Sequence, residues 1–209
     1  MYMKLPESFL TRMQQMLGDE YEPFLASYDQ PAARGLRVNL LKAGPELTLP
    51  FPTSPVEWCP TGHRYSGELR PGLHPWHDAG VYYIQEPSAM AVAEIAAPQP
   101  GERVLDLCAA PGGKTSHLAS LAGDQCLLIS NEIHPQRARI LSRNVERMGI
   151  CNAAVLNETP DRLAERFSSF FDCIVVDAPC SGEGMFRKEP VALEEWSEEN
   201  GALCASRQD

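Results

Sequence analysis

The sequence lacks several features that would place it in a class at once. No apolar run approaches the roughly 18 residues of a membrane-spanning helix, and the first residues lack the uninterrupted apolar core of a secretory signal. The 7 cysteines include no C-x-x-C pair, which argues against a zinc ribbon and against a disulfide framework. These absences predict a reduced, cytoplasmic protein without a membrane segment.

A basic excess is also missing. The chain has 18 lysines and arginines against 28 aspartates and glutamates, a formal net charge of −10. Because neutralisation of phosphates supplies much of the affinity of nucleic-acid-binding proteins, this bulk charge is unfavourable for RNA or DNA. A nucleic-acid role therefore requires a local basic patch, or a basic segment outside these 209 residues.

What is present is the composition of an ordinary globular protein, with 44% hydrophobic and 22% charged residues. Apolar residues recur every four positions over residues 5–17, which predicts an amphipathic helix. Residues 34–42 are typical of a strand. Prolines within residues 43–62 exclude a regular helix and favour an extended, irregular connection. We expect a small α+β domain over residues 1–75 that could contact RNA.

From residue 76 onward, short apolar runs alternate with helical patterns. A short strand and a helix are predicted between residues 80 and 97. Further strands are expected at 102–108, 125–132, 153–157 and 171–180, and helices at 114–122, 135–148, 160–167 and 190–204. This alternation predicts a parallel sheet with helices on both faces. In such doubly wound α/β folds, ligands bind at the carboxyl ends of the strands.

The loop at residues 108–114 follows the first of these longer strands and leads into a helix. Its residues are Cys108, Ala109, Ala110, Pro111, Gly112, Gly113 and Lys114. It is not a phosphate-binding P-loop, because a cysteine stands where that motif requires its first glycine. It is not a dinucleotide fingerprint either, because its glycines are adjacent. Two glycines permit close approach of a ligand to the backbone, and N–H groups at a helix start favour a carboxylate or phosphate.

Glu132 ends the next strand, about 20 residues past the glycines, where an acidic side chain accepts hydrogen bonds from ribose hydroxyls. The loop and Glu132 together favour a ligand with a ribose and a carboxylate but no triphosphate. S-adenosylmethionine fits that description. Each piece alone is also typical of an ordinary turn or of a solvated surface glutamate.

A second motif, DAPCSGEG, covers residues 177–184. Cys180 follows a proline at a strand end, which predicts an exposed thiol at the ligand-binding edge. A thiolate in that position is able to attack an electron-poor carbon. Taken alone, the cysteine and the basic residues that follow it favour a buried structural cysteine and an ordinary turn.

Two segments resemble signature motifs of one family. VLDLCAAPGGKTSHLA (104–119) and VVDAPCSGEGMFRKEP (175–190) are similar to the first and fourth motifs of the Nol/Nop/Sun family of RNA cytosine-5 methyltransferases. Residues 80–90 and 34–39 resemble further segments of that family, and the resemblance is greatest to the bacterial branch acting on 16S ribosomal RNA. It implies a Rossmann-like S-adenosylmethionine-dependent methyltransferase sheet over residues 76–209.

The resemblance also implies a role for each matching residue. Residues 108–114 would wrap the methionine end of S-adenosylmethionine, and Glu132 would hold its ribose. Asn157, or the neighbouring Thr159, would contact the adenine side. Asp177 would lie between the cofactor and the target base.

In this family the cysteine that matches Cys180 assists release of the product. A second cysteine, in a Thr-Cys motif on a later strand, attacks carbon 6 of the cytosine. No Thr-Cys pair follows Cys180 in this sequence, and Cys204 lies in a helical, alanine-rich context. We therefore expect a truncated chain, with a sheet incomplete on its C-terminal side, that binds the cofactor but does not methylate RNA.

Two alternatives stay open. Cys180 could itself be the nucleophile, as the Pro-Cys cysteine is in DNA cytosine-5 methyltransferases. The chain could instead be a cofactor-binding pseudoenzyme or a partner-binding piece without catalysis. We expect ribosomal RNA as the partner, no membrane and no metal, since His74 and His77 lack a third ligand. The oligomeric state and the modified cytosine do not follow from the sequence.

Overall fold

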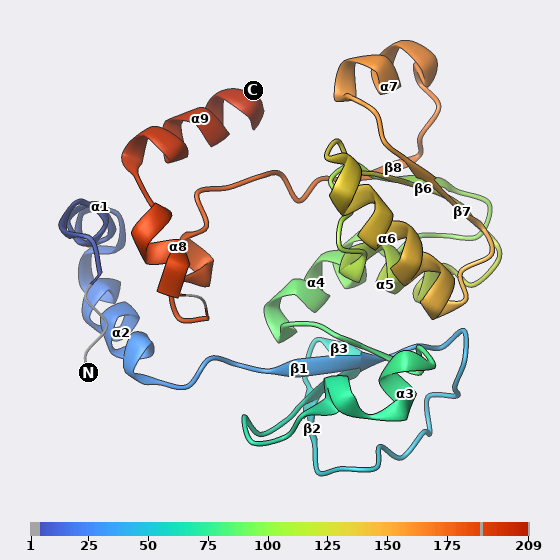
Figure 1. The fold of residues 1–209 in the computed structure, drawn as a ribbon, viewed down its shortest axis with the longest axis horizontal. Coiled ribbons are helices and arrows are strands. Elements are labelled where there is room, and N and C mark those ends of the chain that lie inside the picture. The colour runs from blue at the N-terminus through green and yellow to red at the C-terminus, as the bar shows by residue number, and fades with distance from the viewer. Residues whose placement is uncertain (1–4, 189, 209) are drawn as a thin grey trace. The chain divides into compact units, whose positions relative to one another are not determined.

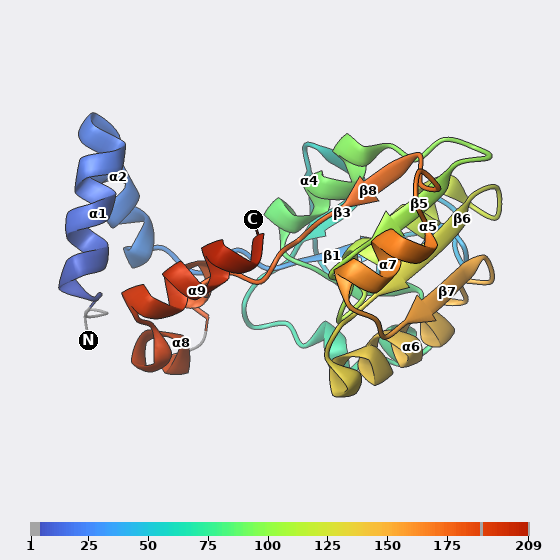
Figure 2. The ribbon, with the colours of Figure 1, turned by 90° about the horizontal axis from the view of Figure 1, so that it is seen from above.

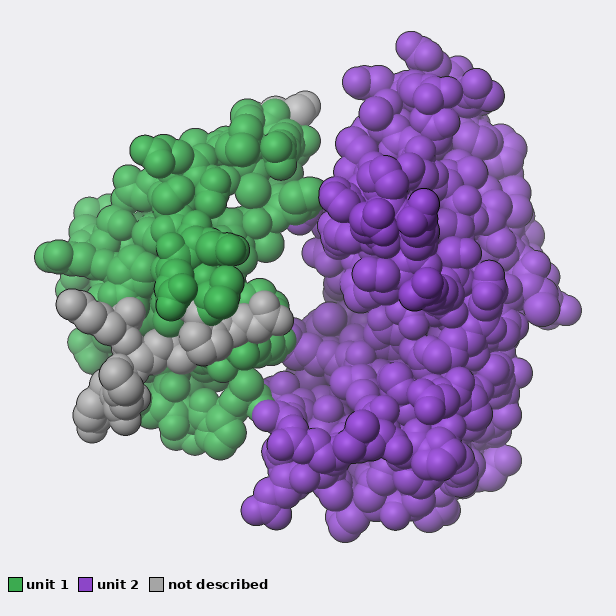
Figure 3. Space-filling model, viewed as in Figure 1, with its two compact units in different colours: residues 1–32, 179–209 green, residues 33–178 purple. Residues whose placement is uncertain are grey.

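Two units make up the chain in the computed structural model, which describes residues 5–188 and 190–208. The large unit spans residues 33–178, and the small unit combines residues 1–32 with 179–209 (Figure 3). The domain boundary expected near residue 75 does not separate these two units. The division into domains of residues 1–75 and 76–209 stays a prediction. The family-like segment 175–190 includes residue 189, which lies outside the described residues.

A four-stranded parallel sheet occupies one half of the large unit. Its strands are β5 (Arg103–Asp106), β6 (Leu127–Asn131), β7 (Ala153–Leu156) and β8 (Cys173–Val175). They lie in the order β7-β6-β5-β8 (Figure 2). The chain thus builds outward from β5 to β7 and then returns to the other side of β5, which makes the ends of β5 and β8 a topological switch point. This arrangement confirms the expected α/β, Rossmann-like sheet.

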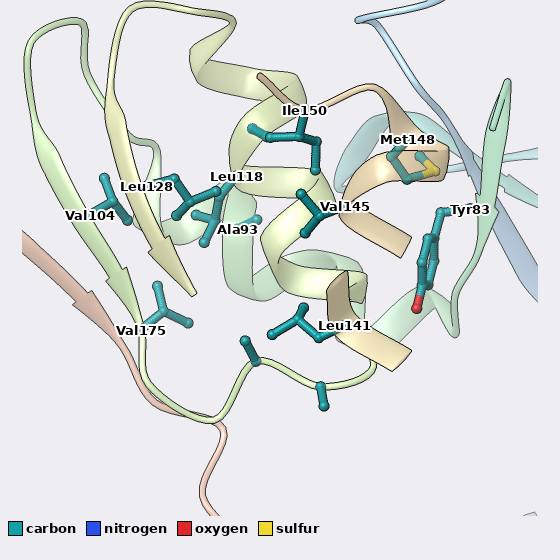
Figure 4. Close-up of a cluster of buried hydrophobic side chains, with 13 residues drawn as sticks. Tyr83, Ala93, Val104, Leu118, Leu128, Leu141, Val145, Met148, Ile150 and Val175 are labelled. Carbon is teal, nitrogen blue, oxygen red and sulfur yellow. The ribbon is translucent and has the colours of Figure 1, made fainter. Parts of the chain in front are cut away.

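Three helices cover one face of this sheet. They are α4 (Pro87–Ala96), α5 (Gly113–Ala122) and α6 (Pro135–Met148). Leu118 of α5 and Leu141 of α6 are fully buried with Val104 and Leu128 of the strands (Figure 4). Burial of apolar side chains on this scale is the main favourable contribution to folding.

The opposite face is covered less completely. Leu105 pairs with Ile129 on β6 and with Ile174 on β8, so the three side chains form one row across the sheet. Leu105 and Ile129 are buried, whereas Ile174 is 56% exposed. Helices therefore cover the first face of the sheet, as predicted. On the opposite face, within the described residues, the prediction of a covering helix is wrong at β8.

An antiparallel sheet occupies the other half of the large unit (Figure 1). Its strands are β1 (Gly35–Val38), β2 (Ser54–Val56), β3 (Cys59–Arg64) and β4 (Tyr82–Ile84), in the order β2-β3-β1-β4. The prediction that residues 43–62 are irregular is wrong for their second half. Strand β2 is at the edge of the sheet and its register shifts at Pro55, and both are positions where a sheet tolerates proline.

Residues that follow β1 cap the C-terminal end of α6. Asn39 Nδ2 donates hydrogen bonds to the carbonyls of Gly80 and Met148, at 2.9 and 2.8 Å. Lys42 Nζ donates to the carbonyls of Ala79 and Arg147, each at 2.7 Å. The last carbonyls of a helix have no partner within it, so these bonds satisfy them and join the two sheets. This is why the large unit extends across residue 75.

The small unit contains α1 (Glu7–Leu17), α2 (Tyr21–Ala26), α8 (Pro190–Glu195) and α9 (Glu198–Gln208). Phe9 and Phe186 are buried and meet edge to face, with ring centroids 5.2 Å apart. The helix predicted at 5–17 is confirmed from Glu7 onward. The single helix predicted over 190–204 is wrong, because the chain breaks at Trp196, whose ring lies 6.1 Å from Phe9. None of the described helices has the length and hydropathy of a transmembrane segment.

Candidate functional site at the carboxyl edge of the parallel sheet

The carboxyl ends of β5, β6 and β8 meet at one edge of the sheet. Asp106 pairs with Ser130 on β6 and with Val175 on β8, so the three strands end level with one another. The chain leaving β5 stays between its neighbours, since the Leu107 N–H donates to the Val175 carbonyl at 2.9 Å. The structure therefore brings the loop 108–114, Glu132 and Asp177 to a common edge, as the sequence predicts.

Gly112 sets the turn that leads from the loop into α5. It has a φ of +111°, which side chains rarely adopt, and its N–H donates to the Ala109 carbonyl at 2.8 Å. An added Cβ would lie 3.2 Å from Leu141 Cδ1. The positive φ therefore favours glycine here, and an added methyl group would require Leu141 to move by a few tenths of an ångström. The N–H groups of the first turn of α5 have no partner within the helix, and such groups favour a carboxylate.

Helix α6 holds the loop from its other side. Arg137 Nη2 donates to the Ala110 carbonyl at 2.9 Å, and Asn144 Nδ2 donates to the Pro111 carbonyl at 2.7 Å. The sequence analysis did not single out either side chain. The one signal available was their seven-residue spacing, which places them on the same side of a helix.

Asp106 is completely buried at the end of β5. Its Oδ2 accepts a hydrogen bond from Thr115 Oγ1 at 2.7 Å, but its Oδ1 has no partner. Burial raises the pKa of this carboxyl from 3.8 to about 6, against smaller lowering effects from the Thr115 hydrogen bond and from the charge of Lys114. A buried carboxylate oxygen without a donor is costly, and a ligand ammonium group would satisfy it. Sequence analysis did not place Asp106 among the site residues.

Glu132 follows β6 and is 2% exposed. Its Oε1 accepts a hydrogen bond from the His134 N–H at 2.9 Å. Its Oε2 lies 3.3 Å from Arg137 Nη1, in a geometry that makes no hydrogen bond. This oxygen is a second hydrogen-bond acceptor at the sheet edge, and a ligand hydroxyl is able to donate a hydrogen bond to it.

Asn157 and Thr159 have local structural partners. Asn157 Nδ2 donates to the carbonyls of Glu132 and Ile133, at 2.6 and 2.9 Å, and thereby steadies the segment that carries Glu132. Thr159 is the N-cap of α7 (Pro160–Arg166), where its Oγ1 accepts a hydrogen bond from the Arg162 N–H. Contact of either residue with an adenine stays a prediction.

The electrostatics of the edge suit a cationic ligand. The pKa of the Cys108 thiol is raised, first by burial and then by the charges of Glu132, Asp106 and Asp177. A thiol in this position stays protonated near neutral pH and is a poor nucleophile. The same negative charges favour a positively charged ligand atom such as a sulfonium.

Cys180 belongs to the small unit, whereas Asp177 belongs to the large unit. Its thiol is exposed, as the Pro-Cys motif predicts. Any shared role of Cys180 and Asp177 therefore stays a prediction.

Comparisons with known proteins give a consistent result. Residues 93–209 match the family model described as 16S rRNA methyltransferase RsmB/F. Residues 5–87 match that of the N-terminal domain of 16S rRNA methyltransferase RsmF. A ribosomal RNA small subunit methyltransferase F of Escherichia coli O127:H6 (strain E2348/69 / EPEC) is 36% identical over 217 residues, covering 97% of this chain and 45% of the relative. The chain thus spans about half the length of the curated relatives that it matches.

Solved structures agree with these matches. A methyltransferase homolog protein from Pyrococcus horikoshii superimposes with a TM-score of 0.77 at 29% identity, covering 90% of this chain and 63% of that one. NSun6 from the same organism, solved with SFG, superimposes with a TM-score of 0.82 at 17% identity, covering 100% and 78%. The second likeness shows the fold alone.

Proposed function

Because the chain belongs to the RsmB/F family of 16S rRNA methyltransferases, we propose that it carries the S-adenosylmethionine site of an RNA cytosine-5 methyltransferase. The substrate would be a cytosine of 16S ribosomal RNA. The observation that carries this proposal is a set of three polar features at the sheet edge. Asp106 Oδ1 and Glu132 Oε2 are buried without a hydrogen-bond partner, and α5 begins beside them with N–H groups that have no partner within the helix.

These features fit the groups of S-adenosylmethionine one by one. The N–H groups that open α5 would hold the cofactor carboxylate. Asp106 would accept from the cofactor ammonium, and Glu132 from the ribose hydroxyls. When bound, the cofactor supplies a methyl group on a positively charged sulfur. The residues of the chain would bind and orient the cofactor from three successive parts of the chain: the end of β5, the start of α5 and the end of β6.

Asp177 would lie between the cofactor and the target base. Its carboxylate is 60% exposed and is paired with Lys114, whose side chain is only 16% exposed. The ion pair leaves one side of Asp177 open to an incoming base while tying the residue to the cofactor loop. Cys180, as an exposed thiol, would assist release of the methylated product.

Calorimetry of this chain with S-adenosylmethionine tests the binding step. We expect one site per chain, and absence of binding would overturn the proposal and leave a partner-binding piece as the alternative. The chemical step is tested with ribosomal RNA and labelled cofactor. Replacement Cys180→Ala should retain a covalent RNA adduct if Cys180 acts in release, whereas loss of the adduct would identify Cys180 as the nucleophile.

A further inference from the structure

Three metal-binding side chains converge in the large unit, away from the residues assigned to the cofactor. Cys59 lies at the start of β3, Glu94 on α4 and His117 on α5. Their sulfur, oxygen and nitrogen atoms all lie within 4.8 Å of one another. We propose that these residues form a binding site for one Zn²⁺-like ion. The ion would join the antiparallel sheet to the two helices behind the cofactor loop.

The separations of the ligand atoms are close to those of a tetrahedral zinc site. His117 Nε2 lies 3.1 Å from Glu94 Oε1 and 3.8 Å from Cys59 Sγ. Zinc–ligand bonds of about 2.3 Å to sulfur and about 2.0–2.1 Å to nitrogen and oxygen give tetrahedral edges of about 3.5 Å for S···N and about 3.3 Å for N···O. These two distances differ from the tetrahedral edges by only a few tenths of an ångström, and the Cys59 sulfur lies within 4.8 Å of a Glu94 oxygen, so rotation of the side chains would close the site.

The ligand types select the class of metal. A thiolate and an imidazole favour Zn²⁺ and related transition ions, whereas Ca²⁺ and Mg²⁺ favour sets made of oxygen. Cys59 and His117 are completely buried, while the Glu94 side chain is 22% exposed and gives the ion a way in. The fourth position would be taken by water or by Thr61 Oγ1, which lies 3.7 Å from Cys59 Sγ.

Binding requires Cys59 to lose its proton, because the thiolate is the ligand. The thiol proton leaves to solvent as the sulfur–metal bond forms, so the site gains one positive charge overall. Arg37 is also completely buried and carries a positive charge that the Glu94 carboxylate partly offsets. His117 Nδ1 is buried without a hydrogen-bond partner, whereas most metal-bound imidazoles have one. These two features reduce the affinity but leave the three-ligand geometry intact.

Cobalt(II) titration of the chelator-treated chain tests the proposal directly. We expect one equivalent to produce sulfur-to-cobalt charge-transfer absorption together with the intense visible bands of a four-coordinate site, and Zn²⁺ to remove both. Cys59→Ser should abolish the charge-transfer absorption. Cys126→Ser changes another buried cysteine that lies outside the cluster, so it should leave the spectrum unchanged.

Three outcomes would overturn the proposal: no charge-transfer absorption, absorption that persists in Cys59→Ser, or absorption lost in Cys126→Ser. Circular dichroism shows whether Cys59→Ser folds. If Cys59→Ser does not fold, the variant Glu94→Gln, changed at a more exposed position, tests the proposal instead. Zn²⁺ should then raise the Tm of the wild-type chain by mass action and leave that of Glu94→Gln unchanged. Equal shifts in both proteins would show that Zn²⁺ stabilises the chain from another site, which would overturn the proposal.

Discussion

Lys114 Nζ lies 2.5 Å from Asp177 Oδ2, an ion pair that ties the segment after β8 to the first turn of α5. Residues 114 and 177 are far apart in the sequence, and the parallel pairing of β5 with β8 brings them together. The lysine stem is largely buried, so the pair loses less to solvent screening than an ordinary surface pair. It links the loop proposed to hold the cofactor to the carboxylate proposed to face the base.

Replacement Lys114→Met should weaken S-adenosylmethionine binding several-fold, because Asp177 would no longer be held beside the loop. The free energy of unfolding should change by no more than about 1 kcal/mol, since the Asp177 carboxylate that remains is solvated. Calorimetry and urea denaturation measure the two quantities. Arg139→Met, at an exposed position on α6, is the matched control. Equal affinities for the two variants would refute the proposed coupling.

Replacement Glu132→Gln should weaken cofactor binding about fivefold, because a hydrogen bond to a charged acceptor is stronger than one to a neutral acceptor by about 1 kcal/mol. The side chain keeps its size and its acceptor oxygen, so the fold should be retained. Glu165→Gln is the control, since that side chain is exposed on α7. A Glu132→Gln chain that binds as tightly as the control would remove Glu132 from the proposed site.

The stability of the chain should depend on the protonation of Asp106. Its pKa is raised from 3.8 to about 6 by burial. The folded state therefore holds this proton more tightly than the unfolded state, and stability falls as pH rises from about 4 to about 6. The difference corresponds to about 3 kcal/mol.

Urea denaturation of the wild type and of Asp106→Asn between pH 4 and pH 7 measures this effect. The variant should gain stability relative to the wild type as pH rises. Asp172→Asn, measured from about pH 2 to about pH 4, should show the opposite sign, because hydrogen bonds from Arg103 lower the pKa of Asp172 to about 2 and the wild type gains stability as pH rises through that window. A pH-independent difference between the wild type and Asp106→Asn would contradict the assignment.

Replacement Gly112→Ala should destabilise the chain by at least about 1–2 kcal/mol, because alanine is strained at a positive φ. The added methyl group would also lie against Leu141. Gly201→Ala in α9 is the control, since its Cβ would meet nothing within 4 Å. This change should be neutral or mildly stabilising by up to about 1 kcal/mol. Equal stabilities would show that the turn at Gly112 adapts.

Sequence periodicity predicted the elements whose formation depends on neighbouring residues. Helix α6 was predicted over residues 135–148 and forms over Pro135–Met148. Proline suits its first turn, and Gly149 ends it in the left-handed conformation with a φ of +74°. The loop after β5 and Glu132 were also predicted correctly as neighbours at one edge, because the ends of adjacent parallel strands must meet.

The elements that sequence reasoning missed depend on distant partners. Strand β3 pairs with both β1 and β2, and its own proline, Pro60, concealed it. The anchoring of the loop by Arg137 and Asn144 requires α6 to pack beside it. Cys59, Glu94 and His117 carry no spacing motif, since they come from three separate elements.

The sequence by itself determined the alternation of strands and helices, the turn chemistry of the loop and the family to which it belongs. Each of these follows from short-range periodicity, from backbone preferences of glycine and proline, and from contiguous motifs. Only the tertiary structure decided which buried oxygens lack a donor, which ion pair links α5 to the end of β8, and which metal-binding atoms converge. Those properties arise from burial and from contacts between residues far apart in the chain, where the pattern of one segment carries no information about its partner.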